Sequence, residues 1–235
     1  GNRESPVTMR MGAAMAKCRW CGRGGLFRAV DNNGLCRDCQ HIVPEIAGHI
    51  RVLKESVELA RGGKTFATRL SRTDVATKHA QELLQYERAG VPTLSPEPSE
   101  LLDMLGRHRR ELVEDEIRTI TDKALEKSQL ASTARTKERA LATAVLKVRE
   151  VVAAAGYGDD VSSTQESSLH SEIHRVKLDA FVDAARKAEF KGNTKKAIDQ
   201  YQEALFFLRN DEIRDADQER VIGEIETKLK ELQAI

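Results

Sequence analysis

Apolar residues recur at helical spacing through most of this 235-residue chain. After Pro44 they step by four, three, four and three residues, which predicts an amphipathic helix. Its apolar stripe consists of Ile46, Ile50, Leu53, Val57 and Ala60. Gly62 and Gly63 follow the last of these positions and are typical of a helix end.

A second helix is predicted over about residues 65–89, and Gly90 and Pro92 stop it. Because only a few residues join the two helices, we expect residues 42–90 to form an antiparallel helical hairpin. The expected buried face of the second helix contains Phe66, Leu70, Ala76, Ala80, Leu83 and Leu84.

Three prolines interrupt the helical pattern in residues 91–98, so we expect a Pro-rich linker there. Beyond it, a long helix is predicted to about residue 130, with a break around residues 128–136. Ser99 is a candidate N-cap for this helix, and Ser95 before Pro96 is the alternative. The polar segment 161–168 is expected to be a loop. Together, residues 99–235 are expected to form a helical bundle.

The four cysteines of the chain form two close pairs near its beginning. Two residues separate Cys18 from Cys21 and Cys36 from Cys39, and fourteen residues lie between the pairs. Two such pairs place four thiolates around one zinc ion, at about 2.3 Å each. Since all four ligands are cysteines, we expect one structural Zn²⁺ rather than a catalytic metal. Four unrelated thiols or two disulfides are the alternatives, and no visible secretory signal favours disulfides.

The segment between the pairs is expected to be a small ribbon. Residues 26–30 are typical of a short strand, and residues 31–34 have strong turn chemistry, with Asn33-Gly34 suited to positive φ. A module of this size cannot bury a core, so metal binding would supply the missing folding energy.

The order Cys-x2-Cys-Gly, Leu-Phe-Arg, Gly-Leu-Cys-x2-Cys resembles a zinc-ribbon or treble-clef knuckle. GATA-type fingers have a similar run, with a longer spacer than this chain has. The resemblance covers residues 17–41. Knuckles of this kind serve both nucleic-acid binding and protein binding, so it leaves both functions open.

Near the other end of the chain, residues 192–205 are similar to the second helix of a tetratricopeptide repeat (TPR), in which a Gly-Asn turn precedes Ala-Ile-x2-Tyr-x2-Ala-Leu. The resemblance covers about 34 residues and implies a TPR-like helical hairpin at about 178–210, followed by a capping helix. No second copy occurs at a 34-residue period, so we interpret it as one hairpin within the bundle and not as a solenoid.

Composition bears on which partners and which compartment are expected. Charged residues make up 32% of the chain and aromatic residues 4%, as in long helices, and the net charge of +1 provides no overall attraction to nucleic acid or membrane. No apolar stretch approaches the ~18 residues of a membrane span, so no membrane partner is expected. Metal-bound thiols indicate a reducing, cytoplasmic location. Residues 1–16 are polar and are expected to be a flexible tail.

The first 40 residues nevertheless carry seven basic and three acidic side chains. Basic residues beside one aromatic residue on a zinc ribbon are typical of a weak nucleic-acid reader. The residues that would make such contacts, to nucleic acid or to a protein partner, are Arg19, Trp20, Arg23, Arg28 and Arg37. The alternative is that Trp20 covers the zinc core and the charges aid solubility.

These patterns predict a mainly α protein: a small N-terminal zinc ribbon, a helical hairpin, and a helical bundle with TPR-like C-terminal helices. No catalytic arrangement is predicted, since every cysteine is assigned to the metal and the carboxylates are spread along helix surfaces. We expect a non-enzymatic zinc-binding adaptor or scaffold that mediates protein–protein interaction, with another protein or a second copy of itself as partner. The alternative is a nucleic-acid-binding protein.

Overall fold

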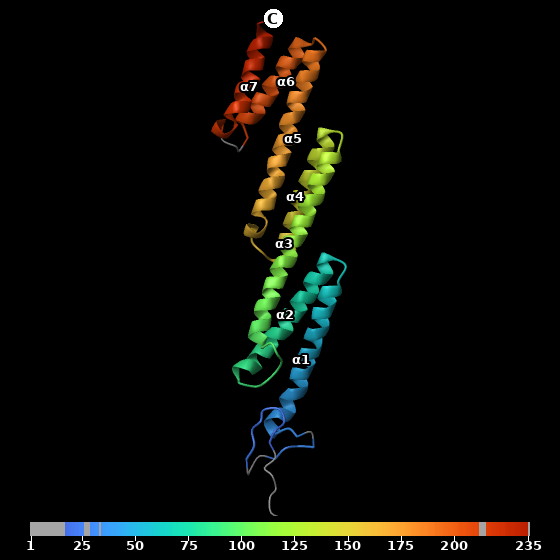
Figure 1. The fold of residues 1–235 in the computed structure, drawn as a ribbon, viewed down its shortest axis with the longest axis vertical. Helices are drawn as coiled ribbons and strands as arrows, with labels where there is room; N and C mark the ends of the chain where they lie inside the picture. Colours follow the sequence, from blue (N-terminus) through green and yellow to red (C-terminus); the bar gives the residue numbers. More distant parts are fainter. Residues whose placement is uncertain (1–16, 26–28, 33, 212–214, 235) are drawn as a thin grey trace, which may run out of the picture. The chain divides into compact units, whose positions relative to one another are not determined.

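The computed structural model describes residues 17–25, 29–32, 34–211 and 215–234 (Figure 1). Within these ranges it is built from α-helices and one short 3-10 helix, so the predicted mainly α fold class is confirmed. The elements are α1 (Arg37–Gly62), α2 (Phe66–Arg88), α3 (Pro98–Leu130), α4 (Ala134–Ala155), η1 (Asp159–Val161), α5 (Ser163–Phe190), α6 (Thr194–Arg209) and α7 (Asp215–Gln233). The chain divides into two compact units, residues 1–112 and 113–235.

Helices α1 and α2 pack side by side as the predicted hairpin. Helix α1 begins at Arg37, earlier than the expected start after Pro44. Pro44 therefore lies inside the helix, where it has no N–H to donate to the carbonyl of Gln40 four residues before it. The helix tolerates this loss because residues on both sides of Pro44 are held by other contacts, described below for the metal centre and the hairpin core.

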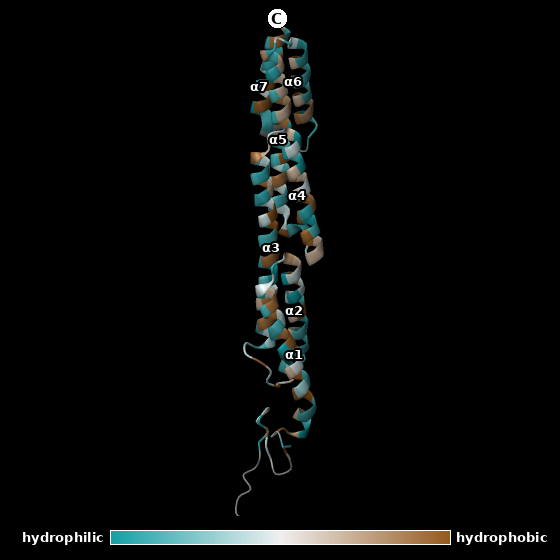
Figure 2. Ribbon diagram, turned by 90° about the vertical axis from the view of Figure 1, so that its right-hand side faces the viewer, coloured by the Kyte–Doolittle hydropathy of each residue, from teal (hydrophilic) through white to brown (hydrophobic). Residues whose placement is uncertain are grey.

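The two predicted apolar stripes form the core of this hairpin. Ile46 and Leu83 are completely buried, and Ile50 and Val57 pack against them with partial exposure. The buried members of the cluster are Ile46, Leu53, Ala76, Ala80, Leu83 and Leu105. Figure 2 shows hydrophobic and hydrophilic residues interleaved along each helix, as one-sided burial requires.

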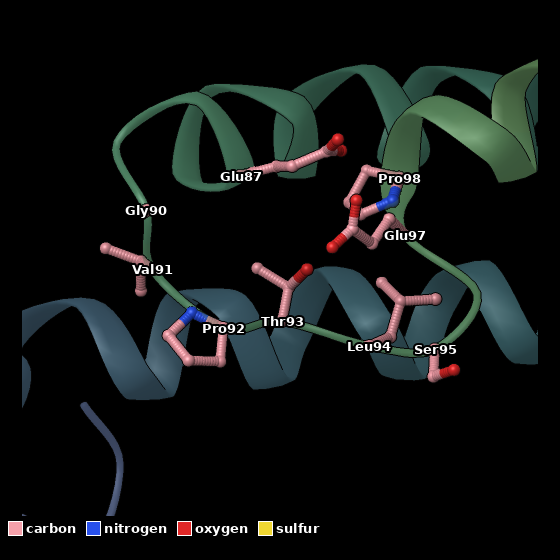
Figure 3. Close-up of a pocket in the computed structure, with 9 residues that line it drawn as sticks. All are labelled: Glu87, Gly90, Val91, Pro92, Thr93, Leu94, Ser95, Glu97 and Pro98. Carbon is pink, nitrogen blue, oxygen red and sulfur yellow. The ribbon is translucent and has the colours of Figure 1, made fainter. Parts of the chain in front are cut away.

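The segment between α2 and α3 is non-helical up to Glu97. Ser99, the predicted N-cap, lies inside α3 instead, and its backbone N and Oγ both donate to the carboxylate of Glu87, at 2.8 and 2.6 Å. A hollow beside this segment is lined by Glu87, Gly90, Val91, Pro92, Thr93, Leu94, Ser95, Glu97 and Pro98 (Figure 3). The Glu87 carboxylate, which lines this hollow, is thus already hydrogen-bonded to Ser99.

In the second unit, α4 packs against α5, α5 against α6, and α6 against α7. The α5–α6 pair forms a helical hairpin at the predicted place, and the side chain of Asn193 caps α6 by accepting a hydrogen bond from the N–H of Lys196 at 3.1 Å. The core of α5, α6 and α7 consists of Ala185, Tyr201, Ala204, Leu208, Ile225 and Leu229.

The expected loop at residues 161–168 is wrong, because α5 begins at Ser163. Glu166 in its first turn accepts hydrogen bonds from Ser162 Oγ at 2.7 Å and from Arg149 Nε of α4 at 2.9 Å. Burial alone would raise the pKa of Glu166, but these two hydrogen bonds, together with the positive charge of Arg149 and the nearby His170, lower the pKa below its usual value. The first turn of α5 is thus held by the local contact from Ser162 and by a second contact from α4, which local sequence does not reveal.

Among the described helices, none combines the length and the apolar character that crossing a bilayer requires.

Candidate metal centre

The first cysteine pair lies on a tight backbone turn. The N–H of Gly22 donates to the carbonyl of Cys18 at 2.9 Å, and the N–H of Cys18 donates to the carbonyl of Arg23 at 2.9 Å. Gly22 has a φ of 69°, in the region that favours glycine. The turn brings Cys18 and Cys21 to the same side of the chain.

The second cysteine pair is the start of helix α1. Cys36 is the N-cap residue, and the N–H of Cys39 donates to its carbonyl at 2.9 Å. Residues three apart in the first turn of a helix lie on one face, so both sulfurs point the same way. The expected ribbon thus has a helix as its second half.

A short turn joins the two pairs. Leu35 N donates to Asp31 Oδ1 at 2.8 Å, and Gly34 has a φ of 74°, as the predicted turn requires. Val30 forms an antiparallel bridge with Cys36. Most of the predicted strand, residues 26–28, lies outside the described residues, as does Asn33.

These turns bring the four cysteine sulfurs within 4.8 Å of one another. The Cys21 and Cys36 sulfurs are 3.9 Å apart, and all four cysteines are free thiols. Cys18, Cys36 and Cys39 are buried, with exposed fractions of 1–3%. Among the described residues, this is the one group in which three or more potential metal ligands come this close.

The surroundings favour ionisation of the Cys18 thiol and disfavour ionisation of the Cys39 thiol. The backbone N–H of Cys21 is the main group that lowers the pKa of the Cys18 thiol, to about 6, against the opposing effect of burial. Burial raises the pKa of Cys39, and its hydrogen bonds to the neighbouring cysteines act in the same direction. Four thiolates in so small a space repel one another, so a bound cation is what would allow all four to ionise, with release of their protons.

The donor set therefore fits a metal ion. Four sulfur ligands select soft or borderline metals, and they leave no position for a substrate or a water molecule. Such a centre can hold two chain segments together, but it cannot act as a Lewis acid on a substrate.

Trp20 connects this centre to the helical hairpin. It packs against the cysteine cluster and also against the core formed by α1 and α2. Its Nε1 is buried and has no hydrogen-bond partner. The Nε1 edge of the side chain therefore faces into the protein, and the side chain as a whole is half-buried.

The arginines proposed as contact residues occupy different places. The side chain of Arg19 lies over Gly34, where a Cβ would come 3.0 Å from Arg19 Cδ. Arg23 and Arg37 are exposed, each close in sequence to one cysteine pair. Arg28 lies outside the described residues.

Sequence reasoning missed one further pair of potential ligands. His49 of α1 and His79 of α2 meet in the hairpin, with their Nδ1 atoms 2.9 Å apart. The available signal was their position: His49 follows Ile46 by three residues, and His79 follows Ala76 by three, so both lie on packing faces.

Comparison of the chain with protein-family models, with curated proteins and with solved structures finds no match, so neither the zinc-ribbon resemblance nor the TPR resemblance is supported by a relative.

Proposed function

We propose that the cysteine centre holds one structural Zn²⁺ and that the protein is a non-enzymatic adaptor. Zinc suits four thiolates in a tetrahedral, closed site, and structural zinc contributes folding energy to modules too small to have a core. Thiolate ligands persist in reducing compartments, which favours the cytoplasm. The metal orders the beginning of the chain, and the helices beyond it offer surfaces to a protein partner.

The observation that best supports an adaptor is the tip of the α5–α6 hairpin. Phe190, the last residue of α5, is 93% exposed, the highest value among the large hydrophobic side chains of the described residues. Exposed lysines surround it in the sequence: Lys187, Lys191, Lys195 and Lys196. An aromatic residue among cations fits the surface of an acidic partner that also offers an apolar side chain.

Two of the charges at this tip, Lys195 and Lys196, also oppose the dipole of the helix they belong to. The first turn of α6 contains Lys195 and Lys196 and no acidic residue. Lysines at the positive end of a helix dipole destabilise it, by about 0.3–1 kcal/mol each. Unfavourable placement of charge without a structural gain is expected at functional sites. An acidic partner would offset the repulsion between these lysines and the positive end of the α6 dipole.

Partner capture tests this proposal. The zinc-loaded full chain serves as bait in a nuclease-treated lysate, beside the variants Phe190→Ser and Lys191→Glu. Phe206→Ser is the matched control, because Phe206 is 67% exposed on the same hairpin but about 18 Å along α6 from its start. We expect both tip variants to lose the same captured protein and the control to retain it.

Two results would contradict the adaptor. One is a bait that retains no protein specifically and, by light scattering, does not associate with a second copy of itself. The other is a captured set that neither tip variant changes, which would remove the hairpin tip from the interface.

Nucleic-acid binding is a second candidate, and the exposure of Arg23 and Arg37 beside the metal centre is the observation in its favour. The inward position of Trp20 weighs against it. Fluorescence anisotropy with labelled DNA and RNA distinguishes the two: a reader binds with an affinity that falls steeply with salt and weakens in Arg23→Ala, whereas an adaptor binds negligibly at physiological salt.

A further inference from the structure

His49 and His79 form a close pair between two packed helices. Their Nδ1 atoms are 2.9 Å apart, and the ring centroids are 5.1 Å apart at an angle of 56°. At this distance one Nδ1 must carry the proton and the other must accept it. The two Nδ1 atoms, each of which can bind a metal once it carries no proton, therefore face each other across the hairpin.

The surroundings hold both rings in place. His49 lies between the buried residues Ile46 and Leu53 of α1, three residues from one and four from the other. His79 lies beside the buried Ala76 and Ala80 of α2. Both imidazoles are half-buried, so they are fixed by packing and still within reach of water.

The surroundings of His79 keep its imidazole neutral. Burial, together with the neighbouring His49, lowers the pKa of His79, which favours the neutral imidazole that metals bind. The positive charge of Lys78 acts in the same direction, and the carboxylate of Glu82, three residues further along α2, opposes it with a smaller effect.

We propose that His49 and His79 together bind one divalent transition-metal ion, such as Zn²⁺, through their Nδ1 atoms. This second site is separate from the cysteines, since His49 follows Cys39 by ten residues, about 15 Å along α1. The ion would connect α1 to α2 in the middle of the hairpin, and water would occupy its remaining coordination positions.

Binding of the metal by two neutral imidazoles neither takes up nor releases a proton overall. The ring that donates in the hydrogen bond changes to its other neutral tautomer, with the proton on Nε2. Both Nδ1 atoms then have a lone pair with which to coordinate the metal. Metal–nitrogen bonds of about 2.0–2.1 Å in a tetrahedral arrangement hold the two nitrogens about 3.4 Å apart, so the pair opens by about 0.5 Å. Two ligands bind more weakly than four thiolates, so the cysteine centre fills first.

Zinc titration of the full chain tests the site. Protein that already holds one equivalent of zinc is titrated with further Zn²⁺ in a calorimeter, and the imidazole nitrogens are followed by NMR. We expect a second, weaker binding event of one equivalent that shifts the His49 and His79 signals. The variants His49→Gln and His79→Gln, whose side chains can still hydrogen-bond to the remaining histidine, should each lose it. His170→Gln, at an exposed histidine of α5, should retain it.

Three outcomes would overturn the proposal: no second event in the unaltered chain up to millimolar zinc, a second event that survives in both hairpin variants, or one that is lost in His170→Gln. Retention of the first zinc equivalent and of the helical circular-dichroism signal in each variant shows that a lost event reflects the ligand and not misfolding.

Discussion

Trp20 provides the sharpest test of how the metal centre and the helical hairpin depend on each other. Complete removal of a buried Trp side chain costs about 3–5 kcal/mol. Trp20 is half-buried between the cysteine cluster and the α1–α2 core, so we expect Trp20→Ala to lower the free energy of unfolding of residues 17–112 by about 2 kcal/mol. Trp20→Phe keeps most of the apolar contact and removes an N–H that is buried without a partner, so its effect should stay within about 1 kcal/mol.

Hydrogen-exchange mass spectrometry of the zinc-loaded chain measures this directly. A loss of 2 kcal/mol corresponds to amide exchange about 30-fold faster. The acceleration should appear in peptides of the α1–α2 hairpin, while peptides from residues 113–235 serve as an internal control. Unchanged exchange in Trp20→Ala, combined with weaker nucleic-acid binding, would refute the packing role and make Trp20 a stacking residue.

Three further predictions follow from the described contacts. Cys36→Ser should abolish stoichiometric zinc binding and the protection of residues 17–41 while the second unit keeps its helicity; mass spectrometry under native conditions would reveal any zinc that remains. Leu208→Ala should destabilise the second unit by about 2.7–5 kcal/mol, because Leu208 is fully buried, whereas Phe206→Ala on the same helix should cost less than 1 kcal/mol; thermal unfolding compares them, and equal costs would contradict the packing. Glu166→Gln should cost about 1–3 kcal/mol at pH 7. Because the pKa of Glu166 is lowered in the folded state, the stabilisation is complete above the usual value of 4.5 and is lost as pH falls through the folded pKa. The difference between the variant and the unaltered chain in denaturant titrations should therefore shrink as the pH is lowered through that pKa.

The sequence predicted the features that depend on local pattern. Apolar spacing identified the buried faces of α1 and α2, and the cysteine spacing identified the four sulfurs that gather. The features it did not predict depend on contacts from elsewhere in the chain. Pro44 led to the prediction of a later helix start, because proline is normally excluded from a helix interior. The contacts that hold α1 on both sides of Pro44 cannot be seen from the local sequence.

The same limit applies to three other places. The first turn of α5 is contacted by Arg149, which belongs to α4, so the polar composition of residues 161–168 was misleading. The inward orientation of Trp20 depends on the hairpin core, and the histidine pair exists only because α1 and α2 pack in one register.

The position of Cys36 at the N-cap of α1 has a consequence for how the chain folds. Starting a helix is the slow step, since the first turn fixes several residues for a single hydrogen bond. A metal bound by Cys36 and Cys39 would hold that first turn in its helical geometry, and a tetrathiolate zinc centre, with its net charge of −2, sits favourably at the positive end of the helix dipole. Zinc would thus serve as the nucleus from which α1 grows, and the rate at which the hairpin forms would depend on the supply of the metal.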